Sequence, residues 1–237
     1  MLWYDVRRSL LSFKMIAIVT VGLLILYQPT LYVYLEEGRW IWENDLLNAV
    51  RDAFGLGYYI MCSTATAAVC ASALFLKDKK SGMVSYLLPR IGTARYILSK
   101  FLCCGLSGAV SLSVPFLAYA FIQYSAFCGW VCEPGAWELI WVDVGLFASY
   151  GFVWAIVGLS ISSWGTNLQM AIASPFGIAF TLKMFCNYTD FKWLDPGLQI
   201  ATLNGPTHPI QWILVGQCVC VLACLSIFVA GVKRCIK

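Results

Sequence analysis

The sequence predicts an all-α polytopic membrane protein with six transmembrane helices, and three observations carry this prediction. First, 60% of the 237 residues are hydrophobic, and the mean hydropathy is +0.76. Second, only 12% of the residues are charged, which is too few to cover the surface of a water-soluble domain. Third, the apolar residues form unbroken runs of about 20, the length that a helix needs to cross the hydrocarbon core. A transmembrane β-barrel would instead show short alternating segments.

Six apolar runs reach the length of a membrane span. They are Met15 to Leu35, Phe54 to Leu76, Tyr96 to Phe121, Ile140 to Ser162, Leu168 to Phe185 and Trp212 to Val232. The first run is longer than a signal-peptide core and no small-residue cleavage site follows it, so we interpret it as a retained span. The connecting loops are short, and we therefore expect residues 1–237 to form a single transmembrane domain.

Residues 1–14 precede the first span and have the pattern of an amphipathic helix. Apolar and polar residues occupy different faces at helical spacing: Trp3, Val6, Leu10 and Phe13 against Asp5, Arg8, Ser9 and Ser12. We expect a short helix in the cytoplasmic membrane interface, with its cations toward the lipid headgroups. The alternative is an extension of the first span, which would carry Arg7 and Arg8 toward the membrane interior at a high cost in free energy.

The distribution of charge predicts which side of the membrane each loop occupies. Segments 1–14, 77–100 and 233–237 hold twelve of the 16 Lys and Arg residues, whereas ten of the 12 acidic residues lie elsewhere. Because cytoplasmic loops carry the excess of Lys and Arg, we expect both termini and the loop 77–95 to be cytoplasmic.

The remaining loops are expected on the outer side. Segment 186–211 is too polar to span the membrane and contains Pro196, Pro206 and Pro209, so it favours short outer helices or re-entrant pieces before the last span. Cys128 and Cys132 lie in another outer loop and would close a small disulfide loop in an oxidising compartment. The sequence leaves open whether they are bonded.

The cytoplasmic loop 77–95 contains the most informative pattern in the chain. Basic residues mark the end of the second span, Gly82 permits a sharp turn, and the apolar-rich stretch from Met83 to Leu88 predicts a short helix. Such a helix, lying along the membrane surface between two spans, is well placed to transmit force from a soluble partner. The alternative is a basic loop that only binds headgroups and sets the topology.

This loop resembles the signature between the second and third helices of type-2 ATP-binding-cassette (ABC) permeases. The shared features are an acidic residue and a Gly before a Leu-Leu pair, then Pro, a hydroxyl residue, Arg and Lys. In this chain they are Phe75, Asp78, Gly82, Leu87, Leu88, Pro89, Thr93, Arg95 and Lys100. The chain departs from the pattern at three places: Pro89 comes about two positions early, Ser85 replaces a common Glu, and Ala94 separates Thr93 from Arg95. The plan of the whole chain is also similar to that family.

The resemblance implies the permease subunit of a bacterial ABC exporter in the cell membrane. Its cytoplasmic helix would couple to a separate ATPase subunit that carries ATP and Mg²⁺, and it would pair with a second copy or a sister permease. The implied ATPase-coupling residues are Asp78, Lys79, Lys80, Ser81, Gly82, Met83, Tyr86, Leu87 and Leu88. The chain itself has no G-x-x-x-x-G-K-[ST] motif, so we expect no nucleotide site here.

No catalytic, cofactor or metal site is predicted, and no nucleic-acid partner. Cys220 and Cys224 share a helix face, but no His or second Cys pair completes a zinc-like set, and His208 is the only histidine. Spans with little internal charge favour an amphipathic or apolar cargo such as a peptide or bacteriocin, a drug or a lipid-linked molecule. The alternatives are a non-transporting membrane scaffold or sensor and, with less support, a membrane-embedded enzyme.

Overall fold

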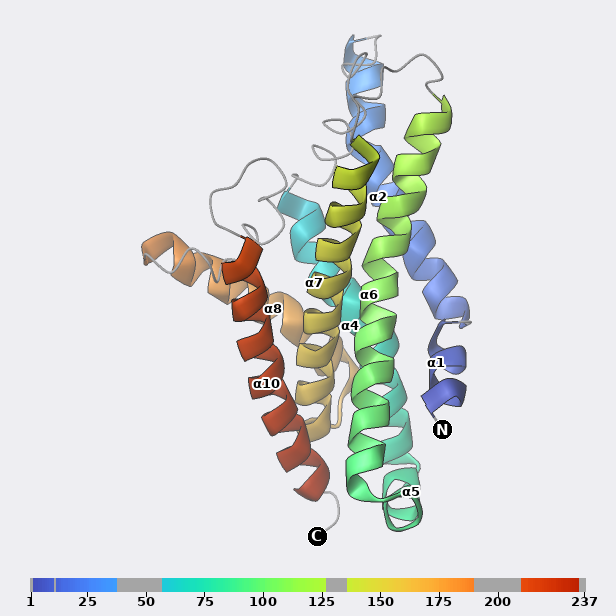
Figure 1. The fold of residues 1–237 in the computed structure, drawn as a ribbon, viewed down its shortest axis with the longest axis vertical. Helices are drawn as coiled ribbons and strands as arrows, with labels where there is room; N and C mark the ends of the chain where they lie inside the picture. Colours follow the sequence, from blue (N-terminus) through green and yellow to red (C-terminus); the bar gives the residue numbers. More distant parts are fainter. Residues whose placement is uncertain (1, 11, 38–56, 127–135, 190–209, 235–237) are drawn as a thin grey trace.

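The computed structural model (Figure 1) describes residues 2–10, 12–37, 57–126, 136–189 and 210–234. Within these ranges the chain is all-helical. The helices are α1 (Leu2–Leu10), α2 (Phe13–Glu37), α4 (Gly57–Lys80), α5 (Met83–Ile91), α6 (Thr93–Ala126), α7 (Ala136–Trp164), α8 (Leu168–Tyr188) and α10 (Ile210–Arg234).

Four of these helices are long and apolar enough to cross a membrane, by length and composition. The spanning segments are Thr93–Ser125, Trp137–Trp164, Leu168–Tyr188 and Gln211–Arg234. The chain is therefore a multi-pass membrane protein. The four spanning segments correspond to the third to sixth predicted spans. The first predicted span lies within α2, whose apolar part found among the described residues, Phe13–Leu26, is shorter than a full crossing. Residues 57–76 of the second predicted span lie within α4.

Helix α7 is the centre of the bundle. It packs against α4, α6, α8 and α10, and Figure 1 shows it between α10 and α6. Its aromatic side chains fill the interior: the ring of Phe147 lies 4.8 Å from that of Phe116 on α6, and Tyr150 lies 5.9 Å from Trp154. Lipid tails are themselves apolar, so such close packing is a main source of helix association in a membrane.

Two glycines set the distance between α6 and α7. A Cβ atom added to Gly108 would collide with the carbonyl oxygen of Gly151, and one added to Gly151 would collide with that of Gly108. These two glycines thus form a close helix crossing inside this chain. At Gly145, also on α7, no atom lies within 4 Å of a Cβ built there.

Helices α1 and α2 are separate: α1 ends at Leu10, and α2 begins at Phe13. Ser12 stands between them, and its hydroxyl accepts a hydrogen bond from the backbone N–H of Met15 at 3.3 Å, capping the start of α2. Helix α1 turns its polar face inward: Asp5 and Ser9 are buried, while Arg7 and Arg8 are exposed. This inward orientation of Asp5 differs from the membrane-facing polar surface that the sequence predicted.

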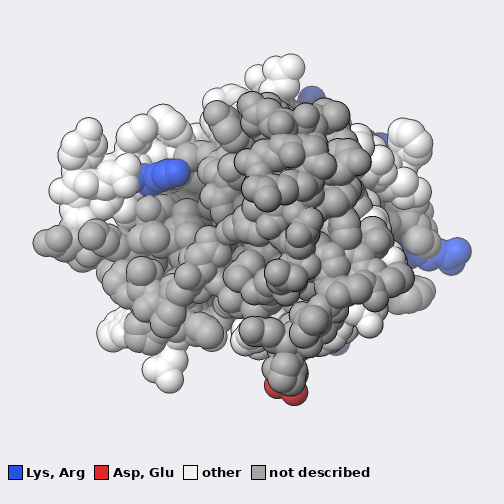
Figure 2. Space-filling view, turned by 90° about the horizontal axis from the view of Figure 1, so that it is seen from above, with Lys and Arg blue, Asp and Glu red and all other residues white. Residues whose placement is uncertain are grey.

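The two ends of the bundle differ. Helices α1 and α5 and the end of α10 lie toward the same end, which is the lower end in Figure 1. Figure 2 looks onto the opposite end, where the charged side chains of the visible described residues are few and scattered. Several expectations fall outside the described residues: Cys128, Cys132 and residues 190–209 of the outer segment 186–211. Residues 186–188 belong to α8.

Candidate functional site

The short helix predicted between the second and third spans is α5, and two glycines separate it from its neighbours. Gly82 has φ = +70° and Gly92 has φ = +84°, values in the region that disfavours side chains with a Cβ. Each glycine lets the chain reverse direction, one between α4 and α5 and the other between α5 and α6. The structure confirms the predicted turn at Gly82 and extends the helix three residues beyond Leu88, to Ile91.

One side of α5 is anchored in the bundle. Val84 and Leu88 are only 2% and 5% exposed, and they join a cluster contributed by four other helices. The buried members of that cluster are Phe75, Val84, Leu88, Tyr96, Ile97, Cys104, Leu159, Phe228 and Val232. Within it the rings of Phe75 on α4 and Phe228 on α10 meet edge to face, with centroids 5.2 Å apart. A displacement of α5 would therefore be passed to α4, α6, α7 and α10.

The other side of α5 is open and partly apolar. Met83 is 49% and Tyr86 is 56% exposed, and the guanidinium of Arg90 lies 4.1 Å from the centre of the Tyr86 ring. Beside it lies a recess of about 380 Å³ lined by Ser85, Leu88, Pro89 and Thr93. Exposed aromatic and Arg side chains beside a hollow are typical of protein-binding surfaces.

Asp78 does not belong to that open surface. Its Oδ2 lies 2.7 Å from Nζ of Lys100 on α6, and the same nitrogen lies 3.0 Å from Oδ2 of Asp5 on α1. All three residues are 4–5% exposed, so the ionic cluster connects α1, α4 and α6 in the interior. Buried charges are tolerated only when paired, since the desolvation cost is several kcal/mol per ion. The side chain of Asp78 therefore holds helices together, and a docked protein would not reach it.

Ser9 and Cys103 extend the same contact between α1 and α6. The Cys103 thiol donates to the Ser9 hydroxyl at 3.6 Å, and that hydroxyl donates to the carbonyl of Val6 at 3.1 Å. The polar residues of α1 are thus used to attach it to α6. These contacts explain why the polar side chains of Asp5 and Ser9 face α6.

Lys79 also has an internal partner. Its Nζ donates to the backbone carbonyls of Ser163 at 2.8 Å and Gly165 at 3.0 Å. These carbonyls lie at the C-terminal end of α7, where the helix has no further backbone N–H groups to offer and where its dipole favours a cation. Lys79 therefore caps α7 and joins it to α4, beside the start of α5.

The structure divides the nine predicted coupling residues into three groups. Lys80, Ser81, Gly82, Met83 and Tyr86 are exposed, whereas Asp78 and Leu88 are buried and Lys79 and Leu87 are intermediate. Sequence reasoning missed the internal roles of Asp78, Lys79 and Lys100. The sequence did hold a signal for Lys100. It is a cation inside an apolar run, and Asp78 is the only acidic residue in the basic loop that precedes it. Nothing in the spacing pointed from Lys79 to residues 163–165.

Among the described residues, no group of three His, Cys, Asp or Glu side chains is placed to hold a metal ion. The chain was also compared with protein-family models, with curated proteins and with solved structures, and no match was found.

Proposed function

We propose that this chain is the membrane-spanning permease subunit of an ATP-driven ABC exporter, and that a separate ATPase subunit acts on α5. The observation that supports the proposal is the two-sided character of α5. Its buried side is part of a cluster shared with α4, α6, α7 and α10, while Met83 and Tyr86 remain open on the other side. A helix that only set the topology would need neither feature.

In this proposal six helices cross a bacterial cell membrane, with α2 and α4 as the first two. Both termini and α5 face the cytoplasm, and α1 lies along the membrane interface against α6. Two permease chains, identical or sister, associate with two ATPase subunits that carry ATP and Mg²⁺. The concentration of Lys and Arg in segments 1–14, 77–100 and 233–237 supports this orientation.

Closure of the ATPase subunits would push on Met83, Tyr86 and the neighbouring recess. Because packed interiors resist compression, the push would move α5 together with the helices it contacts. The Asp5–Lys100–Asp78 cluster and the Lys79 cap favour motion of α1, α4, α6 and α7 as a unit. Such a motion would switch a path through the paired permeases between inward and outward access.

The proposed cargo is amphipathic or apolar, such as a peptide, a drug or a lipid-linked molecule. The ion pairs of Lys100 with Asp5 and Asp78 lie near α5. The spanning segments of α6 and α10 are mainly apolar, which favours such a cargo over a small hydrophilic ion.

The test is reconstitution with a candidate ABC ATPase subunit. Tagged chain should bring down the ATPase, and ATP hydrolysis should depend on the chain. The variant Tyr86→Ser with Met83→Ser should lose both, whereas Lys233→Glu, an exposed change on α10, should lose neither. Partner binding without chain-dependent hydrolysis would indicate a scaffold, and no binding at all would contradict the proposal.

A further inference from the structure

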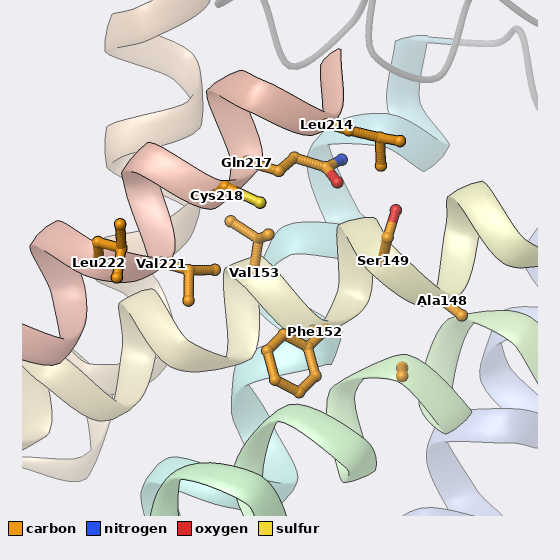
Figure 3. Close-up of a pocket in the computed structure, with 10 residues that line it drawn as sticks. Ala148, Ser149, Phe152, Val153, Leu214, Gln217, Cys218, Val221 and Leu222 are labelled. Carbon is orange, nitrogen blue, oxygen red and sulfur yellow. The ribbon is translucent and has the colours of Figure 1, made fainter. Parts of the chain in front are cut away.

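A cavity of about 570 Å³ lies beside α7, between α6 and α10 (Figure 3). Both helices pack on α7 but make little contact with each other, so the space between them is left for the cavity. Its walls include Ala109 from α6, Phe152 and Val153 from α7, and Val221 and Leu222 from α10. The volume is within the range of small-molecule sites, roughly 300–1,000 Å³.

One amide side chain interrupts the largely apolar lining. Gln217 on α10 is only 6% exposed, and Figure 3 shows its amide directed into the cavity. It makes no hydrogen bond within the part of the chain that the structure describes. The nearby hydroxyl of Ser149 already donates to the carbonyl of Leu146 at 2.8 Å, which leaves its oxygen as an acceptor.

A buried primary amide without a partner is costly. It offers two N–H donors and one carbonyl acceptor, and an amide moved out of water without a compensating hydrogen bond loses a substantial part of its solvation free energy. Gln217 lies in a spanning segment, where bulk water is absent. A bound molecule with its own hydrogen-bonding group would remove this cost.

The lining also limits the chemistry of that molecule. None of the described residues that line the cavity is charged, so an ionised group would be buried there without a partner among them. The apolar walls from α6, α7 and α10 favour a hydrocarbon chain. The single amide of Gln217 favours one uncharged group that both donates and accepts, or accepts alone.

We propose that this cavity binds an acyl chain, with an uncharged amide or ester group hydrogen-bonded to Gln217. The site does not depend on the proposed exporter function, because binding needs only this chain in a membrane. Two sources share this chemistry: a phospholipid of the bilayer, and an acylated molecule that is not part of it.

The experiment uses the full chain reconstituted in phosphatidylcholine vesicles that contain a photoactivatable palmitamide. Light should attach this probe to peptides of α7 and α10 that line the cavity, and Gln217→Leu should reduce the labelling of those peptides roughly tenfold, the loss expected from about one hydrogen bond in an apolar site. Gln211→Leu is the matched control, because Gln211 is an exposed glutamine on the same helix. Its labelling should equal that of the unchanged chain.

A second variant, Ala109→Leu, narrows the cavity from α6 and should reduce labelling without removing the amide. Each variant must elute from size-exclusion chromatography as the unchanged chain does. Equal labelling of Gln217→Leu, or labelling spread evenly over the lipid-facing helices, would overturn the proposal. A phosphatidylcholine with the same photoactivatable group in its palmitoyl chain distinguishes the sources. If it labels the same peptides, the ligand is a bilayer lipid, and if only the palmitamide does, the ligand is an acylated molecule of another kind.

Discussion

Nζ of Lys100 lies 2.7 Å from Oδ2 of Asp78, and this contact joins the end of α4 to the first turns of α6 across the intervening helix α5. The glycine turns at Gly82 and Gly92 allow the chain to bend at both ends of α5. The ion pair fixes the distance between the helices that α5 connects. It thereby determines the geometry in which α5 is presented.

Removing the cation of this cluster should be strongly destabilising. Lys100→Met leaves the carboxylates of Asp5 and Asp78 buried without a counter-ion, and breaking a buried pair in this way costs about 3–5 kcal/mol. Denaturant unfolding in detergent micelles, followed by tryptophan fluorescence, measures the loss. Lys77→Met, at an exposed position, should change the stability by less than about 0.5 kcal/mol.

The same cluster predicts a rescue. Adding Asp5→Asn and Asp78→Asn to Lys100→Met removes the uncompensated charges, so much of the lost stability should return. If the triple variant is no more stable than Lys100→Met alone, the loss comes from packing and the electrostatic interpretation is wrong.

Lys79→Ala should destabilise the junction of α4 and α7 by about 1–3 kcal/mol, because two carbonyls at the end of α7 lose a charged donor. Lys80→Ala is the neighbouring control, since that side chain is exposed and should change stability little. The rate of amide hydrogen exchange at residues 160–165 should rise in Lys79→Ala and not in Lys80→Ala. Equal exchange in both would mean that the cap does not stabilise the helix end.

Gly108→Ala should disrupt the crossing of α6 and α7. The added methyl group would collide with the backbone of Gly151, and overpacking of this kind costs about 1–3 kcal/mol or more. Gly145→Ala, on α7 but in open space, should be neutral or stabilising by up to about 1 kcal/mol, since alanine favours the helix. Thermal unfolding in micelles compares the two. Similar losses in both variants would argue against a tight crossing at Gly108.

Substitutions on the two sides of α5 should have different effects. A change on the buried side should lower stability, and a change on the exposed side should reduce coupling to the ATPase. Val84→Ser places a hydroxyl in the buried cluster and should lower the unfolding free energy by about 1–3 kcal/mol. Tyr86→Ser, on the exposed side, should leave it unchanged while reducing chain-dependent ATP hydrolysis with the partner ATPase. The proposed role of the exposed face fails if the partner ATPase hydrolyses ATP at the same rate with the Tyr86→Ser chain as with the unchanged chain.

Hydropathy and glycine spacing predicted much of the fold near this site. The turn at Gly82, the short helix after it and the four later spans follow from local rules, because each depends on residues close in sequence. The direction in which α1 faces did not follow. The polar residues of α1 could equally face a membrane surface or contact another helix. Which of the two occurs depends on α6, nearly one hundred positions away, where Cys103 contacts Ser9 and Lys100 contacts Asp5.

The sequence by itself determined a multi-pass helical chain, and it predicted that its cations gather around one short helix. Length, apolar content and charge bias carry that information without reference to distant contacts. Only the tertiary structure decided what each cation does. Lys80 is exposed, Lys79 caps α7, and Lys100 pairs with two buried carboxylates. Neighbours in sequence on a helix point in different directions, about 100° apart per residue, so adjacent lysines reach different surroundings.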